Sequence, residues 1–546
     1  MNSQFGSDNV DVDLVIVGAG FSGLYLTYRA KQLGFSVRVF EAGTSVGGTW
    51  YWNTYPGARC DVESIDYSFS FSEELQQEWN WSERYAAQPE ILAYLNHVAD
   101  RFDLRRHVTF NSRVTSAEFF DDGWLITTST GETVRSTFCV MASGGLSAPK
   151  KPDFEGLDDF RGEWFHTARW PAEGVDVRGK RVGVIGTGST GIQAIPQLAK
   201  NAEHVTVFQR TPNYSVPARN RPLSQDELNE VKATYSDRRA RARRAPSGVP
   251  PVSAPEPGAP LSEEQRVSVL EAGWEFGGAP VLLRAFSDVM TDAGVNKTVG
   301  DFVRRKIAET VKDPATAKAL APTDYPFGAK RLCVDTDYYQ TYNRDNVELV
   351  DLRGNPIERI TADGVVCGGI EHKVDVLVFA IGFDAISGAL TEIDLIGRDG
   401  RQLREYWRGG PKATLGVQVA GFPNLFLVNG PGSPAVLGNV VTFAEQHIEW
   451  ITECLDYLRA HSISTIETTE ELDDGWAAHV DEVGATTLYV KAKSWYTGEN
   501  VPGKPRRFLP YAGGLDVFRD KCDEIANKGY EGFVLTPARA EATSTV

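Results

Sequence analysis

Two stretches of the chain share one hydrophobic pattern. Each has a short run of aliphatic residues, a glycine-rich turn, and then apolar residues at helical spacing. The first run, 13–17, precedes G-A-G-F-S-G, and the second, 181–185, precedes G-T-G-S-T-G. Unbroken Val/Ile runs are typical of parallel strands buried on both faces. Because strand, G-x-G-x-x-G turn and helix form a dinucleotide-binding motif, the pattern predicts two Rossmann-like domains in an α/β fold.

The glycines of each turn have separate physical tasks. The first permits the tight turn, the second lets the backbone approach a pyrophosphate, and the third allows close packing of helix on strand. The pyrophosphate would lie at the positive end of the helix, against free N–H groups. The residues predicted to make these contacts are Gly18, Gly20 and Gly23 in the first unit, and Gly186, Thr187, Gly188, Ser189, Thr190 and Gly191 in the second.

The residue after the second strand of each unit distinguishes the two nucleotides. In the first unit the strand 37–40 ends in Glu41, which can accept hydrogen bonds from an unmodified ribose and would repel a 2′-phosphate. In the second unit the strand 205–208 is followed by Arg210 and Thr211, with no acid. A guanidinium and a hydroxyl suit the 2′-phosphate of NADPH. We therefore expect FAD in the first site and NADPH in the second.

The order of the elements predicts domains that are nested in one another. Strand patterns return at 374–380 and 424–428, after a charged, helix-prone stretch that contains a loop with six prolines between 246 and 260. The predicted organisation is an FAD-binding domain at 1–150 and 384–546, an NADP-binding domain at 151–220 and 331–383, and a helical insertion at 221–330.

Composition and charge exclude several classes of protein. The net charge of −17 and the pI of about 5.1 argue against a nucleic-acid partner. One basic run, 238–244, is interpreted as a solvated helix face. The six cysteines form no C-x-x-C pair and no metal-ligand spacing with histidine, so we expect no metal site, no disulfide framework and no dithiol redox centre.

The location of the protein is predicted from the same features. The scattered cysteines fit a reducing cytoplasm. The first 13 residues are polar and acidic, unlike a signal peptide, and no apolar run approaches the roughly 18 to 20 residues that cross a bilayer. We expect a cytoplasmic protein with no membrane association, present as a monomer or a weak homo-oligomer.

Three segments are too specific to be generic loops. They are G-G-T-W-Y-W-N-T-Y-P-G-A-R-C-D at 47–61, F-R-G-E-W-F-H-T-A-R-W-P at 160–171, and S-W-Y-T-G-E-N-V-P-G-K-P at 494–505. Together they resemble the motifs of type I Baeyer–Villiger monooxygenases, over essentially the whole chain. The resemblance implies that NADPH reduces FAD, that reduced flavin and O₂ form a C4a-peroxide, and that this peroxide converts a ketone into an ester or lactone.

The resemblance also assigns roles to individual residues. Arg331, in the segment 325–331, would stabilise the peroxyanion and the tetrahedral intermediate, as suits a permanently charged group with several donors. Asp61 would hold that arginine beside the flavin. Lys330 would be a second contact to the 2′-phosphate. His166 would act in the linkage between domains rather than in the chemistry.

Further resemblances concern the cofactors and the substrate pocket. Gly48, Thr49 and Trp50 would lie beside the flavin, and Trp495 either belongs to a mobile loop that closes over NADP or is a core aromatic. The predicted pocket residues are Gly145, Ala435, Val436 and Leu437. At Gly145 a member of the family has a larger polar residue, so we expect bulky or cyclic ketones to be accepted. At 380–382 the chain has A-I-G where the family usually has A-T-G, and a hydroxyl contact is lost.

Two other functions remain open from the sequence. An N- or S-oxygenating flavin monooxygenase shares both nucleotide folds, but its fingerprint lacks the Trp170-Pro171 ending. A non-catalytic flavoprotein that senses NADPH would not need Arg331 and Asp61. A flavin disulfide reductase would need a redox cysteine pair, which the chain lacks.

Overall fold

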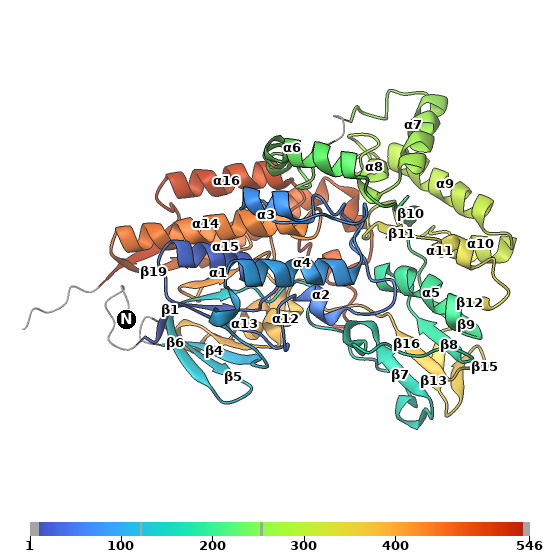
Figure 1. The fold of residues 1–546 in the computed structure, drawn as a ribbon, viewed down its shortest axis with the longest axis horizontal. Coiled ribbons are helices and arrows are strands. Elements are labelled where there is room, and N and C mark those ends of the chain that lie inside the picture. Colours follow the sequence, from blue (N-terminus) through green and yellow to red (C-terminus); the bar gives the residue numbers. More distant parts are fainter. Residues whose placement is uncertain (1–9, 121–122, 252–254, 539–546) are drawn as a thin grey trace, which may run out of the picture.

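The computed structural model describes residues 10–120, 123–251 and 255–538. Two sheets lie at opposite ends of the molecule, with helices above and between them (Figure 1). The strands form where the sequence predicts them: 13–17 lies within β1 (Val12–Val17), 181–185 is β8 (Arg181–Ile185), and 424–428 contains β18 (Leu425–Leu427). The predicted α/β fold with two dinucleotide-binding units is confirmed.

The first sheet has the strand order β17-β4-β5-β6-β1-β2-β3, and β18 pairs with β6. The strands β1, β2, β3, β6 and β18 pair in parallel, while β4, β5 and β6 form an antiparallel meander. Its other strands are β2 (Val37–Phe40), β3 (Val108–Thr109), β4 (Val114–Phe120), β5 (Gly123–Thr128), β6 (Thr133–Met141) and β17 (Asp394–Ile396). The sheet therefore draws on both ends of the chain.

Helices bury one face of this sheet. In Figure 1, α1 (Phe21–Gln32) lies beside α14 (Val440–Ala460), and the two pack together although far apart in sequence. The other elements here are α2 (Thr49–Trp52), α3 (Glu73–Glu78), α4 (Gln88–Arg101), α12 (Gly388–Thr391), α13 (Leu403–Tyr406), β19 (Ile463–Thr468), α15 (Glu470–Ala485), α16 (Leu515–Asn527) and β20 (Phe533–Pro537).

The second sheet is parallel throughout, with the order β12-β9-β8-β16-β7. Its strands are β7 (Glu163–His166), β8, β9 (His204–Gln209), β12 (Val347–Asp351) and β16 (Val376–Phe379), and α5 (Ser189–Asn201) follows β8. A separate antiparallel sheet of β13 (Ile357–Ile360), β14 (Gly364–Cys367) and β15 (Ile370–Lys373) packs against it through apolar side chains. The strands of this sheet come from 163–209 and 347–379; the exact domain bounds stay a prediction.

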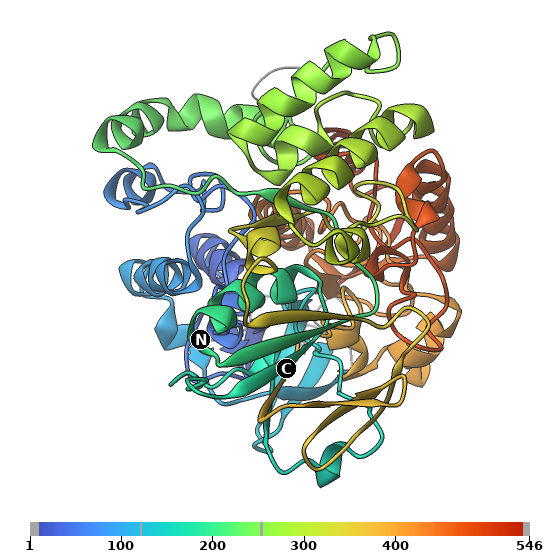
Figure 2. The same ribbon diagram turned by 90° about the vertical axis from the view of Figure 1, so that its right-hand side faces the viewer.

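The chain segment between the two groups of strands in the second sheet is mainly helical. They are α6 (Gln225–Arg243), α7 (Glu263–Phe276), α8 (Ala279–Leu283), α9 (Ala293–Thr310) and α10 (Pro314–Leu320), and they form the green layer that crosses the top of the molecule in Figure 2. The described residues of the proline-rich loop contain no helix or strand. The chain leaves through β10 (Ser215–Pro217) and returns through β11 (Cys333–Asp335), which pair in parallel before the short α11 (Tyr338–Thr341).

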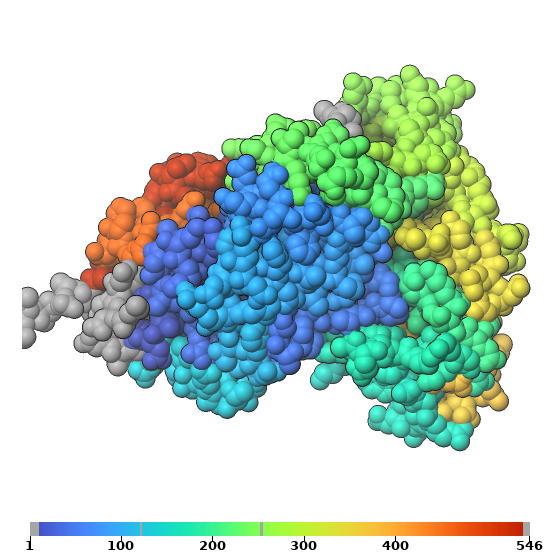
Figure 3. Space-filling model, in the orientation of Figure 1, coloured from blue at the N-terminus to red at the C-terminus, as the bar shows by residue number. Residues whose placement is uncertain are grey.

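The interpretation of the basic run 238–244 as a solvated helix face is wrong for Arg238 and Arg239, although Arg241 and Arg244 are exposed. Arg239 is only 8% exposed and donates to the carbonyls of Ile65 and Asp66 and to Ser68 Oγ. Arg238 donates through Nε and Nη2 to the buried carboxylate of Asp66, both at 2.7 Å. In Figure 3 the green chain of α6 lies directly on the blue chain. The acceptors that bury these arginines lie some 170 residues away, so the local charge pattern could not reveal them.

The structure also bears on the expectations about cysteines, membrane spans and metal sites. All six cysteines are buried free thiols. No helix in the described part of the chain is long and apolar enough to cross a membrane. Within the same residues, no three His, Cys, Asp or Glu side chains are placed to hold a metal ion. Residues 1–9, on which much of the signal-peptide expectation rests, lie outside the described residues.

Candidate active site

Both glycine-rich turns have the geometry that their sequence predicts. Gly18 has a φ of +104°, and a Cβ there would lie 2.7 Å from the carbonyl oxygen of Ala142. Gly186 has a φ of +111°, and a Cβ would lie 2.5 Å from the carbonyl oxygen of Ala380. In contrast, nothing lies within 4 Å of a Cβ built at Gly188. The first glycine is therefore required by packing, while the middle glycine leaves open space where a pyrophosphate can approach.

The third glycine of each motif is also required by packing. A Cβ at Gly23 would overlap the carbonyl oxygen of Gly18, and the same is true of Gly191 and Gly186. The middle glycine of the first turn, Gly20, faces Gly48, whose Cα would lie 3.3 Å from an added Cβ. The predicted flavin-side residues of the 47–61 motif thus pack directly on the first turn.

Glu41 lies at the end of β2, as predicted, and is 5% exposed. Its carboxylate accepts hydrogen bonds from the backbone N–H of Ala19, at 2.9 Å, and of Gly43, at 2.7 Å. Each carboxylate oxygen has a second lone pair, so both can also accept from ribose hydroxyls. The same side chain therefore fixes the first turn and presents acceptors beside it.

Arg210 lies after β9, at the same edge of the second sheet as the Gly186–Gly191 turn, and is exposed. Within the described residues its side chain makes no hydrogen bond or ion pair, and its neighbour Thr211 accepts a 3.1 Å hydrogen bond from Thr187 Oγ1 through its carbonyl oxygen. Lys330 lies over the ring of Tyr325, 4.6 Å from its centroid. Burial, and then the charge of Arg210, lower the pKa of Lys330. Two predicted phosphate contacts therefore come close together as cations that lack a carboxylate partner.

Asn213 joins this cationic group to Arg331, and the sequence analysis missed it. Its side-chain N–H₂ donates to the carbonyl oxygen of Arg331 at 3.3 Å and to Cys333 Sγ at 3.0 Å. Its Oδ1 accepts from the hydroxyl of Tyr325 at 2.9 Å. No local pattern singles out an asparagine four residues past a strand; only the return of the chain through β11 gives it these partners.

Arg331 and Asp61 form a two-point ion pair, as the resemblance implies. Nε donates to Oδ2 at 2.9 Å and Nη2 donates to Oδ1 at 2.5 Å, while Nη1 donates to the carbonyl oxygen of Val436 at 2.8 Å. Burial alone would lower the pKa of Arg331, but the Asp61 carboxylate, together with Tyr496 and Cys60, holds that pKa above its ordinary value. The guanidinium is thus permanently charged and fixed from two sides.

The motif around Asp61 is held against the second domain. A Cβ at Gly57, whose φ is +85°, would overlap the carbonyl oxygen of Gln193 on α5. The Gln193 side chain accepts from the hydroxyl of Tyr55 at 2.7 Å and donates to the carbonyl oxygen of Arg59 at 3.0 Å. The motif therefore carries Asp61 across the boundary between the two sheets.

The second motif, 160–171, contacts the first motif, 47–61, from the second domain. Arg169 lies over the ring of Trp52 at 4.6 Å, and the carbonyl oxygen of Trp170 accepts from Thr54 Oγ1 at 3.0 Å. His166 is 6% exposed, and its Nδ1 accepts from the N–H of Ala168. Burial, and then Arg169, lower the pKa of His166 to about 4, so its ring is neutral at pH 7. The role of His166 in the linkage between domains stays a prediction.

Comparisons with known proteins identify the family of the chain. A family model described as pyridine nucleotide-disulphide oxidoreductase matches residues 15–244. The chain is 39% identical to a Baeyer–Villiger monooxygenase of Pseudooceanicola batsensis over 529 residues, 96% of each protein. It is 42% identical to an acetone monooxygenase (methyl acetate-forming) of Gordonia sp. (strain TY-5), covering 96% of this chain and 99% of that one. The chain belongs to the Baeyer–Villiger monooxygenase family.

Solved structures agree with this assignment. The fold superposes on steroid monooxygenase bound to NADP with a TM-score of 0.92 at 49% identity, and on a closed cyclohexanone monooxygenase with 0.94 at 44%; each covers 96% of this chain and 99% of the other. A structure of OTEMO in complex with FAD and NADP gives 0.93 at 39% identity, over 96% of this chain and 100% of that one.

One relative differs in the reaction for which it is named. The chain is 42% identical to a phenazine N-monooxygenase of Lysobacter antibioticus, over 97% of this chain and 98% of that protein. Membership of the Baeyer–Villiger monooxygenase family therefore does not by itself decide between oxidation at carbon and at nitrogen.

Trp50 and Trp495 occupy different environments in this member of the family. Trp50, on α2 next to Thr49, is buried and donates from Nε1 to the hydroxyl of Tyr67 at 3.2 Å. Trp495 is half-buried and stacks at an angle on Tyr496, with ring centroids 4.5 Å apart. It also packs against a small apolar cluster beside Val436, on the side where Arg331 is anchored. Whether Trp495 closes over NADP stays a prediction.

The predicted substrate residues lie around that same apolar cluster. The carbonyl oxygen of Gly145 accepts from the N–H of Ile386 at 2.7 Å, and a Cβ on Gly145 would lie 3.6 Å from the Ile386 Cα. Ile386 has a φ of +67°, which is strained for a β-branched residue, and Ala435 has a φ of +39°. Val436 and Leu437 are half-buried beside them. A Cβ at Gly145 would already be in van der Waals contact with Ile386, and the substrate pocket at these residues stays a prediction.

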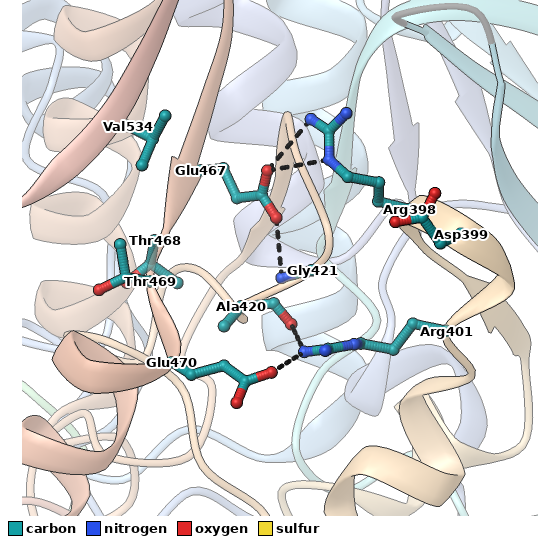
Figure 4. A pocket seen from close by; sticks show the side chains of 10 residues that line it. All are labelled: Arg398, Asp399, Arg401, Ala420, Gly421, Glu467, Thr468, Thr469, Glu470 and Val534. Carbon is teal, nitrogen blue, oxygen red and sulfur yellow. Dashed lines mark hydrogen bonds and ion pairs between the residues drawn. The ribbon is translucent and has the colours of Figure 1, made fainter.

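A hollow elsewhere on the surface has no part in this site. It has a volume of about 470 Å³ and is lined by residues of 398–401, 420–421, 467–470 and Val534. In Figure 4 its two arginines, Arg398 and Arg401, already pair with Glu467 and Glu470. Both arginines are thus already paired, and no predicted site residue lines the hollow.

Proposed function

We propose that the chain binds FAD in the first dinucleotide-binding domain and NADPH in the second, and uses O₂ to convert ketones into esters or lactones. The observation that carries the proposal is the Arg331–Asp61 pair, which the two domains assemble beside Val436. The acetone monooxygenase (methyl acetate-forming) among the relatives, and the FAD and NADP bound in related structures, support it.

The described residues fit both cofactors. The open space at Gly188, with Arg210 and Lys330 nearby without carboxylate partners, suits a pyrophosphate and a doubly charged 2′-phosphate. Glu41 and the Gly18–Gly23 turn suit the unmodified ribose and pyrophosphate of FAD. FAD, when bound and reduced, supplies the chemistry that activates O₂.

Arg331 would stabilise negative charge that develops on the oxygen atoms of the reacting substrate. A guanidinium has five N–H donors, and the contacts to Asp61 and Val436 use three of them, which leaves two for a substrate oxygen. Because Asp61 holds the guanidinium in place, the site needs no reorganisation when negative charge develops on the substrate oxygen. Asp61 itself is a positioning residue.

A second candidate function is oxygenation at nitrogen or sulfur, which the similarity to a phenazine N-monooxygenase favours. A third, a sensor of NADPH without catalysis, would leave Arg331 and Asp61 without a task. Bulky or cyclic ketones are the proposed substrate class, since the chain has no side chain at Gly145, next to Ile386.

A substrate panel separates these functions. The purified, FAD-loaded protein is given NADPH, O₂ and either small ketones, bulky ketones, sulfides or aromatic N-heterocycles, and products are identified by mass and retention. Esters or lactones from ketones support the proposal; N-oxides or sulfoxides alone favour the second candidate. Substrate-independent NADPH oxidation with no oxygenated product favours the sensor. Equal rates for small and bulky ketones would remove the bulky-substrate proposal only.

We also propose a cytoplasmic location, supported by six buried cysteines that remain thiols. The expected state is a monomer or a weak homo-oligomer, which light scattering over a range of concentrations would test.

A further inference from the structure

Lys150 lies in the segment that connects the two domains, and its backbone is fixed at the edge of the second sheet. Its N–H donates to the carbonyl oxygen of Gly382 at 3.0 Å, and Pro149 pairs with Phe383 in an antiparallel bridge. Both partners lie just past β16. Since β16, β8 and β9 are parallel neighbours, Lys150 is at the same carboxyl edge as the Gly186–Gly191 turn and Arg210.

The space between these segments is open. Nothing lies within 4 Å of a Cβ built at Gly188, nor of one built at Gly382. Below them the strand ends are in contact, because a Cβ at Gly186 would meet the carbonyl oxygen of Ala380 at 2.5 Å. A dinucleotide that follows the glycine-rich turn would therefore pass between Arg210 on one side and the 149–150 segment on the other.

The direction of the Lys150 side chain is also fixed. Nζ donates to the carbonyl oxygen of Asn500 at 3.1 Å, and Asn500 in turn donates to the carbonyl oxygen of Phe383 at 2.8 Å. An ammonium has three N–H donors, and this is the single hydrogen bond that Lys150 Nζ makes within the described residues. The remaining donors are free to meet an anion.

The charges around this space are not balanced. Burial, and then the charge of Arg210, lower the pKa of Lys150, as they do that of Lys330. Of the two carboxylates that act in the opposite sense, Asp384 is already paired with Lys504, and Asp324 accepts a hydrogen bond from Thr323. Lys150 and Lys330 are thus each repelled by Arg210, and a bound anion of double charge would relieve this repulsion.

We propose that Lys150 is a third residue that recognises the 2′-phosphate of NADPH, beside Arg210 and Lys330. The inference rests on the proposed function, because it assumes that the second domain takes NADPH. Lys150 is then a determinant of the preference for NADPH over NADH, at a position that no glycine-rich motif marks.

The test is calorimetric binding of NADP⁺, NAD⁺ and 2′,5′-ADP to the FAD-loaded protein at low salt, with no turnover. Lys150→Gln is expected to weaken binding of NADP⁺ and 2′,5′-ADP about tenfold, the effect of one partly screened charge-assisted contact, and binding of NAD⁺ by less than about twofold. Lys150→Arg, which keeps the charge, is expected to restore most of the affinity. Lys151→Gln is the matched control, because Lys151 is the exposed neighbour.

Arg210→Ala provides the reference that separates the two proposals. If Arg210→Ala weakens NADP⁺ binding while Lys150→Gln behaves like Lys151→Gln, the role of Lys150 is refuted and the NADPH site stands. If Lys150→Gln weakens NADP⁺ and NAD⁺ equally, Lys150 does not read the phosphate and the inference is also refuted. If neither Arg210→Ala nor Lys150→Gln changes the preference for NADP⁺, the proposed NADPH site itself fails.

Discussion

Arg331 and Asp61 stand 270 positions apart in the chain, yet the two side chains meet edge to edge, with Nε to Oδ2 at 2.9 Å and Nη2 to Oδ1 at 2.5 Å. The third nitrogen, Nη1, is held by the carbonyl oxygen of Val436. Three distant segments thus fix one guanidinium at the boundary of the two domains.

Arg331→Ala is expected to lower ester formation by about 100-fold or more, because one preorganised charge is lost where negative charge develops. Reduction of the flavin by NADPH, measured anaerobically, should change by less than about twofold, since Arg331 is not a predicted NADPH phosphate contact. Arg331→Lys tests whether charge alone suffices; we expect most of the loss to remain, because lysine lacks the fork that pairs with Asp61. Arg398→Ala, at a surface ion pair, is the control. Normal ester yields from Arg331→Ala would contradict the assignment.

Glu41→Gln is expected to weaken FAD retention about tenfold, because one carboxylate acceptor becomes an N–H₂ group that faces a backbone N–H. The measurement is the flavin-to-protein ratio after gel filtration, with the dissociation constant for added FAD. Glu132→Gln, which alters a partly exposed ion pair with Arg38 on the same sheet, serves as the control. A Glu41→Gln protein that keeps its full flavin content would show that the ribose contact is not made here.

Arg239→Ala is expected to lower the free energy of unfolding by roughly 2–3 kcal/mol, since buried carbonyl and hydroxyl acceptors lose a charged donor. Arg241→Ala changes the same helix, but Arg241 is about half exposed and donates only to the carbonyl of Pro251 within the described residues, so a change of less than about 0.5 kcal/mol is expected. Thermal and urea unfolding compare the two. Equal effects would mean that α6 is not held by its buried arginines.

Asp335→Asn is expected to stabilise the protein at pH 8 and not at pH 4. Burial raises the pKa of Asp335 from its ordinary value of 3.8 to about 6, despite hydrogen bonds from Ser215 and from the N–H of Tyr338. Because the folded pKa lies above the unfolded one, the favourable contribution of the protonated form is complete below about pH 4 and is lost as the pH rises through 6. The difference corresponds to about 3 kcal/mol at most.

The measurement for Asp335 is the melting temperature of both proteins from pH 4 to pH 8. The exposed Asp345, ten residues along, provides the control variant Asp345→Asn. Asparagine keeps an acceptor for the Tyr338 N–H and offers a donor to Ser215, so both contacts survive. Parallel curves for wild type and Asp335→Asn over this range would show that Asp335 is not the titrating group.

The local sequence was sufficient to predict a residue's role wherever the constraint on that residue comes from its neighbours in the chain. The glycines at 18 and 186 need positive φ and a close carbonyl, and Glu41 lies at a strand end beside its own turn, so these positions were predictable from spacing. The Arg331–Asp61 pair was predictable only from its resemblance to a family, because no spacing links residues 270 apart.

The sequence by itself determined the two strand–turn–helix units, the contrast between Glu41 and Arg210, and the absence of a cysteine pair. Tertiary structure alone decided that Arg239 is buried, that Asn213 connects Arg331 to Tyr325, and that Lys150 lies at the NADP edge of the second sheet. The physical reason for this difference is where each residue's interaction partners lie in the chain. Backbone geometry and strand burial depend on neighbouring residues, whereas hydrogen-bond acceptors and compensating charges come from segments that only the completed fold brings together.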